Sequence, residues 1–201
     1  MRPRDAKHSV KIGVLALQGA IDPHIEKLQS LGVEPVRVRT PDQLARVSGI
    51  ILPGGESTAM IHLLKVNRLW NPLKAFVQTK PAWGVCAGVI LLAKEVSHPK
   101  QESLDALDIS VTRNAYGRQN ESFVDNVQPT DKWMDKNPVE GVFIRAPKID
   151  RIGPGVKTLL THRNDAVFVE QGNLLAATFH PELTTNASLH KYFVEKCLSE
   201  K

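Results

Sequence analysis

Four short strand-like runs, separated by segments with helical spacing, constrain the fold of this 201-residue chain more than any other feature. Residues 10–19 read VKIGVLALQG, a nearly continuous apolar run closed by glycine, and further runs follow at 34–39, 49–55 and 81–86. Apolar strands that alternate with helices are typical of a parallel sheet with helices on both faces. The first half of the chain is therefore predicted to form such a sheet.

The segments between these runs carry helical signals. Apolar residues recur at helical spacing from 21 to 31, and Gly32 behind them predicts the end of that helix. Residues 57–79 are predicted to be helical with a break near Asn71-Pro72. Another helical pattern opens directly after Cys86.

The pattern changes from about residue 108, where strand-like segments follow one another through short turns. A last helix is expected at 187–198, and the polar residues 97–108 are expected to form a surface loop or short helix. The sequence thus predicts one three-layer α/β domain over 11–201, after an N-terminal extension at 1–10. Its central sheet should be largely parallel, with an antiparallel extension.

Composition excludes several classes of function. Lys and Arg exceed Asp and Glu by 26 − 21 = +5, but the charges are interspersed, which disfavours nucleic acid as a partner. No apolar stretch approaches the ~20 residues that a membrane-spanning helix needs. Cys86 and Cys197 are too few for a secreted disulfide framework, so both are expected to be free thiols of a cytoplasmic protein.

Cys86 lies in a chemically suggestive turn. The sequence Gly84-Val85-Cys86-Ala87-Gly88 has the form of a nucleophile elbow, a tight turn between a strand and a helix, with sulfur in place of serine. The start of a helix lowers a thiol pKa and offers the Ala87 N–H to a developing oxyanion. The plainer interpretation is that Cys86 is a small buried apolar residue.

His180 and Glu182 supply a possible base and its orienting group. They are two residues apart at the end of an apolar run, so an extended chain would point both side chains to one face. Together with Cys86 they predict a Cys-His-Glu triad. Taken alone, His180 could equally be a structural histidine.

The loop at 52–58, LPGGEST, is the third signal. Gly54 and Gly55 let backbone N–H groups approach a ligand closely. Alternatively, the loop is an ordinary tight turn in which Ser57 or Thr58 caps the next helix.

These motifs together resemble the class I (triad) glutamine amidotransferases, which have a flavodoxin-like fold. GVLALQGA at 13–20, RNAYGRQ at 113–119 and FIRAP at 143–147 are similar to the glutaminase subunits of pyridoxal 5′-phosphate synthase. The resemblance covers about residues 11–196. One departure from the family pattern is Val85, where many members carry threonine.

The resemblance implies that the chain hydrolyses L-glutamine to L-glutamate and ammonia. It makes Cys86 the nucleophile, His180 the acid and base, and Glu182 the partner of His180. The other positions that it implies fall into two groups: a glutamine site of Gly54, Gly55, Glu56, Ser57, Arg113, Ile144 and Arg145, and an oxyanion region of Gly55, Ala87 and Gln18.

The arginines have more than one interpretation. Arg113, Arg118 and Arg145 could be surface charges, but an inward-facing arginine in the apolar run at 142–147 would need a carboxylate. Either the substrate's α-carboxylate or an internal acid such as Glu56 would serve.

The resemblance implies no metal or cofactor, but it does imply a partner. Ammonia would be delivered to a separate barrel-shaped synthase subunit that makes pyridoxal 5′-phosphate (vitamin B6), in a complex with up to twelve copies of each subunit. Three alternatives stay open at this point: the glutaminase partner of an amidotransferase in histidine or purine biosynthesis, a hydrolase or peptidase, and a regulatory subunit with a vestigial site.

Overall fold

The computed structural model describes residues 10–113, 122–133 and 135–199. Three predicted features lie wholly or mostly outside these residues: residues 1–9 of the predicted extension at 1–10, Arg118, and most of the 113–119 motif. The helices are α1 Ile21–Ser30, α2 Pro41–Ala45, α3 Ser57–Val66, α4 Trp70–Thr79, α5 Ala87–Leu92, the 3-10 helix η1 Pro181–Leu183 and α6 Ser188–Leu198. The strands are β1 Lys11–Leu15, β2 Glu34–Val38, β3 Gly49–Leu52, β4 Ala82–Val85, β5 Ala93–Ser97, β6 Leu107–Thr112, β7 Ser122–Pro129, β8 Val139–Ile144, β9 Lys148–Ile152, β10 Lys157–His162, β11 Asp165–Gln171 and β12 Leu174–Ala177.

The central sheet has two parts. Its strand order is β2-β1-β3-β4-β12-β11-β10-β7-β8. The pairs from β2 through β12 are parallel, whereas those from β12 through β8 are antiparallel. The predicted fold class is therefore confirmed, and the strand at the junction, β12, comes from the far end of the chain.

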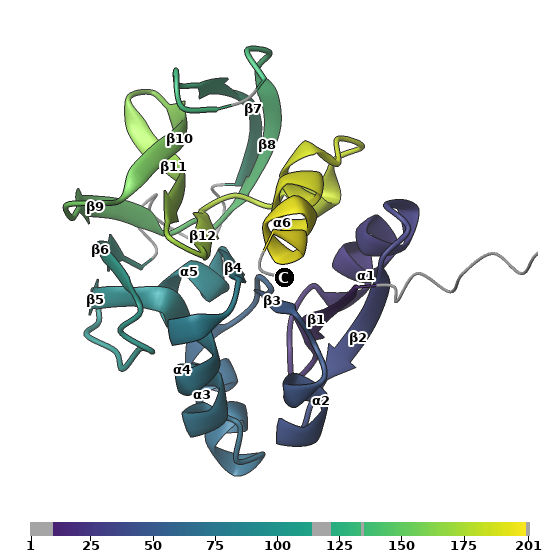
Figure 1. Ribbon diagram of the computed structural model, residues 1–201. Coiled ribbons are helices and arrows are strands. Elements are labelled where there is room, and N and C mark those ends of the chain that lie inside the picture. Colours follow the sequence, from purple (N-terminus) through teal and green to yellow (C-terminus); the bar gives the residue numbers. More distant parts are fainter. Residues whose placement is uncertain (1–9, 114–121, 134, 200–201) are drawn as a thin grey trace, which may run out of the picture.

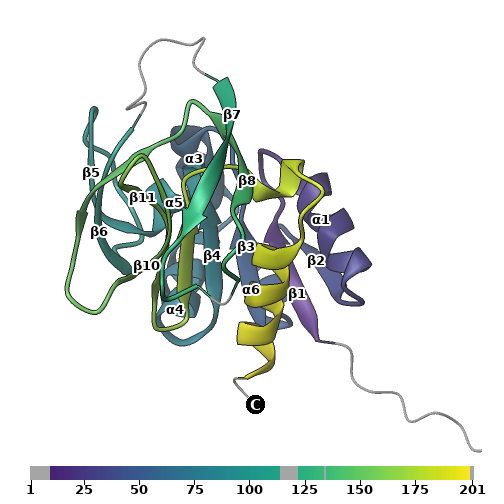
Figure 2. The same ribbon diagram turned by 90° about the horizontal axis from the view of Figure 1, so that it is seen from above.

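Helices cover both faces of the parallel part. Figures 1 and 2 show α3 and α4 on one side and α1 and α6 on the other. In β3, Ile50 and Leu52 join the core beneath α3 and α4, while Ile51 joins the core beneath α1 and α6. Since all three side chains have no exposed area, this alternation explains why an apolar run without polar positions forms a strand here.

The helix predicted to open after Cys86 is present, and it is short. α5 ends at Leu92, and residues 93–97 form β5 of a small second sheet, ordered β5-β6-β9. The loop that follows β5 supplies the reason, because its N–H groups from Leu104 and Ala106 bond the carbonyls of Leu91 and Leu92 at 2.7 and 3.1 Å. These contacts occupy the carbonyl groups at the end of α5.

The predicted helix break at Asn71-Pro72 is wrong. The chain breaks at Asn67–Leu69, where Arg68 has φ 56° and Leu69 N–H bonds Leu64 O at 2.8 Å. This is a Schellman ending with arginine in the position that glycine usually takes. Pro72 lies in the first turn of α4, where a missing N–H costs little.

Two further elements had no counterpart in the sequence analysis. These are the strand β9 and the short helix α2, whose N-terminus is capped by a capping box between Thr40 and Gln43. Each is only five residues long, which is too short for the spacing of apolar residues to indicate a helix or a strand.

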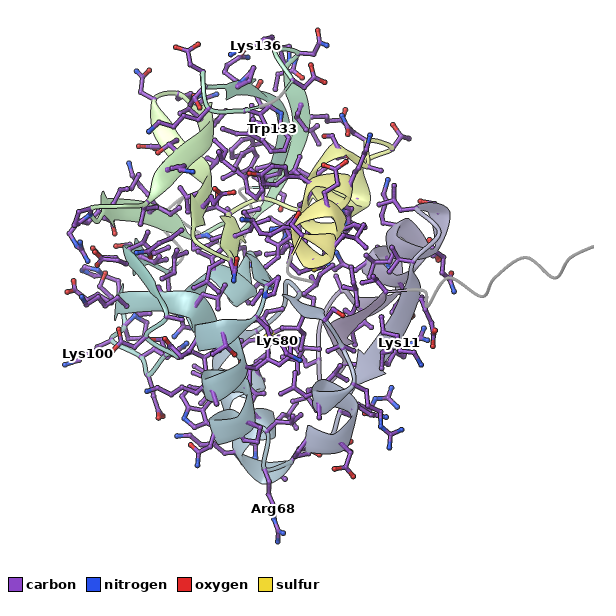
Figure 3. All side chains as sticks on the ribbon, in the orientation of Figure 1. Lys11, Arg68, Lys80, Lys100, Trp133 and Lys136 are labelled. Carbon is purple, nitrogen blue, oxygen red and sulfur yellow. The ribbon has the colours of Figure 1, made fainter. Side chains whose placement is uncertain are left out.

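Charged side chains lie around the whole molecule. Figure 3 shows Arg68, Lys100 and Lys136 projecting outward at separate places. Among the residues that the structure describes, no helix is long and apolar enough to cross a bilayer.

The two faces of α3 give a direct test of this packing. Leu64 is completely buried, whereas Val66, two residues later, is 63% exposed. Leu64→Ala should lower the free energy of unfolding by about 2–5 kcal/mol, because it leaves a cavity. Val66→Ala should change it by less than about 0.5 kcal/mol. Urea unfolding measures both, and equal losses would contradict this packing.

Candidate active site

The parallel pairing of β4 with β12 brings Cys86 and His180 together. Val85 and Ala177 are register partners at the carboxyl ends of the two strands, and Cys86 N–H bonds Ala177 O at 2.8 Å. Three residues further, His180 N–H bonds Val142 O at 2.8 Å, which fixes the histidine between β12 and β8. Ligand sites of open α/β sheets commonly lie at this end of the strands.

The turn at Cys86 depends on its two glycines. Cys86 has φ 49° and ψ −104°, a conformation that costs energy for any residue with a side chain. A Cβ at Gly84 would lie 2.4 Å from Gly88 O, and one at Gly88 would lie 2.1 Å from Leu52 O. Neither position admits a side chain, so the turn can pack tightly against β3, and the largely buried Cys86 lies at its tip, where it borders a cavity.

His180 and Glu182 form the other half of the site, but not by the predicted route. Residues 181–183 form the 3-10 helix η1 rather than an extended strand. Within this turn, His180 Nδ1 donates a hydrogen bond to Glu182 Oε1 at 2.7 Å. Both residues are buried, at 6% and 4% exposure.

The pKa of His180 reports its surroundings. Burial disfavours the imidazolium, but hydrogen bonds with the Cys86 side chain and with Glu182, together with their negative charge, raise the pKa of His180 to about 10. This favours a charged imidazolium next to the sulfur. The sulfur also lies 3.9 Å from Ile144 O, the last residue of β8.

The loop after β3 forms the wall opposite the thiol. A Cβ at Gly54 would lie 2.4 Å from His180 Cε1 and 3.4 Å from Cys86 Cβ, so glycine leaves room for both side chains. Ala20 N–H bonds Gly54 O at 3.0 Å. Gln18 Oε1 accepts from the Glu56 N–H at 3.0 Å. The loop after β1 thus holds the predicted substrate loop in place.

Glu56 begins α3. Its carboxylate accepts from the backbone N–H groups of Thr58 and Ala59 at 3.2 and 2.7 Å. Neither Ser57 nor Thr58, the residues considered from the sequence, is the N-cap. Burial raises the pKa of Glu56, but a hydrogen bond from the Thr58 hydroxyl, the two backbone bonds and the Arg113 guanidinium outweigh it and lower the pKa.

The arginines differ from one another. Arg113 is largely buried, with Nη2 3.6 Å from Glu56 Oε1, so an internal acid faces it. Arg145 does not face inward: it is exposed and has φ 44°, just beyond β8. Of the two interpretations left open for Arg145, the structure therefore supports the exposed one, and the residue borders the cavity.

A cavity of about 300 Å³ lies between these elements, which is at the small end for ligand sites. Of the predicted residues, the following line it: Gly54, Gly55, Glu56, Ser57, Cys86, Ala87, Arg113, Ile144, Arg145 and His180. Gln18 and Glu182 do not line it and instead hold residues that do. Gly19, Ala20 and Ile90 line it without having been predicted, although two of them belong to the quoted GVLALQGA motif.

Gln101 is a further neighbour that the sequence did not reveal. The buried Ser57 hydroxyl donates to Gln101 Oε1 at 3.0 Å. Gln101 lies in the polar segment at 97–106, which carries no recognisable motif. The segment at 97–106 therefore helps to hold the predicted substrate loop, residues 52–58, in place.

A thiol, an imidazole and a carboxylate in series, beside a small cavity, form an arrangement suited to nucleophilic acyl transfer. A family model, the SNO glutamine amidotransferase family, matches residues 14–199. The chain belongs to this family.

Individual relatives agree with this assignment. "Pyridoxal 5'-phosphate synthase subunit PdxT" of Solibacter usitatus is 47% identical over 189 residues, which is 92% of this chain and 98% of the relative. The protein of the same name from Thermotoga petrophila is 50% identical over 187 residues, with the same coverage. A crystal structure of a glutamine amidotransferase shares 41% identity with a TM-score of 0.85, over 92% of this chain and 98% of its own. The predicted family and the predicted resemblance are confirmed.

The raised pKa of His180 leads to a prediction about stability and pH. Because the folded pKa of His180, about 10, exceeds the ordinary histidine pKa of 6.5, the stabilisation is complete below about pH 6.5 and is lost as pH rises toward 10. His180→Gln should therefore lower the free energy of unfolding most near pH 6, by up to about 5 kcal/mol. The loss should shrink toward pH ~9.

Urea unfolding at both pH values measures this difference. His62→Gln, at an exposed position of α3, is the matched control and should show little change at either pH. A His180→Gln effect that grows with pH would show that His180 is not held as an imidazolium.

Proposed function

We propose that this chain hydrolyses L-glutamine to L-glutamate and ammonia at the Cys86 site, and that it supplies the ammonia to a separate synthase subunit that makes pyridoxal 5′-phosphate. The observation that carries the proposal is that Cys86 and His180 line one cavity, with His180 hydrogen-bonded behind it to the buried Glu182. The family and the names of the relatives support the same reaction.

The first half of the reaction forms a thioester. With the proton on His180, the Cys86 thiolate attacks the side-chain carbonyl carbon of glutamine and forms a tetrahedral oxyanion. Backbone N–H groups of Ala87 and the Gly55 region stabilise that oxygen. His180 then protonates the departing nitrogen, and ammonia leaves.

The second half releases glutamate. His180, now neutral, removes a proton from water, and the water oxygen attacks the γ-glutamyl thioester. Collapse of the second tetrahedral intermediate expels the Cys86 thiolate next to His180, which still carries the proton taken from water, and the product γ-carboxylic acid loses its own proton to solvent as glutamate leaves. Glu182 keeps the imidazole oriented through its bond to Nδ1 in both halves.

The wall of the cavity provides groups for the amino acid end of the substrate. Arg113 is cationic and largely buried, so it can bind the α-carboxylate, with Glu56 orienting the guanidinium. Ser57, Gly54 and the Ile144-Arg145 backbone complete the glutamine site. The same groups would hold the γ-carboxamide against the sulfur.

The acceptor of ammonia lies on another chain in this proposal. Free ammonia is mostly protonated near neutral pH and then cannot act as a nucleophile, so direct delivery preserves its reactivity. The relatives are named as subunits of pyridoxal 5′-phosphate synthase. We propose a barrel-shaped synthase partner, in a complex of up to twelve copies of each subunit.

The two cysteines provide a matched test of the nucleophile. Cys86→Ala should lower glutamine hydrolysis about 10³-fold or more, because no thioester can form. Cys197→Ala, at a buried position of α6, should keep full activity. Release of glutamate and ammonia is measured with and without a purified synthase subunit. Full activity of Cys86→Ala would rule out the proposed nucleophile.

Arg113 provides a test of substrate binding. Arg113→Ala should raise KM for glutamine about tenfold or more, since a hydrogen bond to a charged group contributes about 1.5–3 kcal/mol. Arg68→Ala, at an outward-pointing position (Figure 3), should leave KM unchanged. Steady-state kinetics of both variants decides the point, and an unchanged KM for Arg113→Ala would remove it from the glutamine site.

A further inference from the structure

A row of buried polar groups continues from Glu182 away from the cavity. Glu182 Oε2 and His24 Nε2 are 3.7 Å apart, and neither side chain has any exposed area. Within the described part of the chain, neither of these two atoms has a hydrogen-bond partner. On the other side of the same ring, His24 Nδ1 lies 2.9 Å from His190 Nε2. The row joins α1, η1 and α6 beneath the proposed triad.

Packing alone does not explain this row. The His24 and His190 rings lie edge-on to Trp83, with centroids 6.0 and 4.8 Å from its ring, in an otherwise apolar core. Apolar side chains of similar size would fill that space without burying polar atoms, which are costly when left unpaired. Two histidines in line with a carboxylate therefore call for a polar role.

Both histidines are neutral in this environment. Burial, and then the proximity of His190 and His180, hold the pKa of His24 well below its usual range. Burial and the nearby Lys27 lower the pKa of His190 to about 3. A neutral imidazole has one N–H donor and one acceptor nitrogen, so the row has a direction.

The carboxylate sets that direction. An ionised Glu182 only accepts, and its Oε1 already accepts from His180. The His24 atom that faces Oε2 must then be an N–H, which places the proton of His24 on Nε2 and leaves Nδ1 as an acceptor. The proton of His190 consequently lies on Nε2, which donates to His24 Nδ1 across 2.9 Å.

We propose that His24, oriented by His190, is a positioning residue of the triad, whose Nε2–H donates to Glu182 Oε2 when substrate is bound. His180 and His24 would then hold one carboxylate from both of its oxygens and fix the plane in which His180 is oriented. This inference rests on the proposed glutaminase triad and extends it by residues from α1 and α6.

The 3.7 Å separation is longer than a hydrogen bond. Catalytic hydrogen bonds are often long in the absence of substrate and shorten in the complex. α1 is also linked to the chain beyond η1, because Lys27 Nζ donates to Thr184 O at 2.5 Å. The proposal requires the Glu182 carboxylate or the His24 ring to rotate so that this separation shortens.

Kinetics of three variants tests this role in the full chain with its synthase subunit. His24→Leu should lower kcat about tenfold to a hundredfold while KM for glutamine stays within about twofold, because His24 does not touch the substrate. His24→Gln can place an amide N–H near Nε2 and should recover most of kcat. His162→Leu is the control. His162, on β10, is also a buried histidine next to a carboxylate, with Nε2 2.9 Å from Asp125 Oδ2, but it lies outside the site.

A second measurement does not depend on activity. Nitrogen-15 NMR of labelled histidines distinguishes the two neutral tautomers of each ring. The proposal predicts protons on Nε2 of both His24 and His190. A proton on Nδ1 of His24, with Nε2 bare, would overturn it even if every variant folds poorly.

The outcomes separate this inference from the proposed function. A wild-type chain that hydrolyses no glutamine beside its synthase subunit would overturn the proposed function. A wild-type chain that is active, together with an equally active His24→Leu variant, would overturn only the role of His24. Adding His190→Leu to His24→Leu should cause no further loss of kcat, and an additive loss would show that His190 does not act through His24.

Discussion

The pairing of β12 with β4 is the constraint on which the site depends. β12 enters the sheet next to β4 in parallel, with Ala177 opposite Val85, so both strands end at the same edge. Cys86 follows one strand and His180 follows the other. A shift of one residue in this register would move every side chain of β12 to the opposite face of the sheet, and the thiol would lose its histidine. Packing of the whole sheet therefore fixes the distance between the Cys86 thiol and the His180 imidazole, on which the chemistry depends.

Glycines at the carboxyl-terminal edge of these strands leave the space that the reactive side chains and a substrate need. Cys86 occupies a strained backbone conformation because the missing side chains of Gly84 and Gly88 let its turn pack against β3. Gly54 leaves space for Cys86 and His180 on the opposite wall. The strain is maintained by buried strands on both sides, and it presents a sulfur next to an imidazole that burial alone would have left neutral.

The sequence allowed prediction of the features that local patterns encode. Apolar runs located the parallel strands, and the GVCAG and HPE motifs located the residues that the structure brings together. Their catalytic roles remain predictions. What local patterns did not reveal depended on contacts between distant segments: α5 stops where the loop at 104–106 binds its last carbonyls, and α3 ends on an arginine rather than a glycine.

The site shows the same division. His180 and Glu182 were expected to meet along an extended strand, but they meet within a 3-10 turn. His24, His190 and Gln101 belong to no motif, and only tertiary packing places them behind the triad or the substrate loop. Patterns along a chain report residues that face a substrate more readily than residues that support them.

The central claim is that Cys86 forms a covalent bond with the glutamyl group during turnover. Rapid acid quenching of the reaction with glutamine, followed by peptide mass spectrometry, tests it most directly. The account predicts a γ-glutamyl thioester on the peptide that contains Cys86 and on no other. Turnover without an adduct at Cys86, or with the adduct at Cys197, would contradict it.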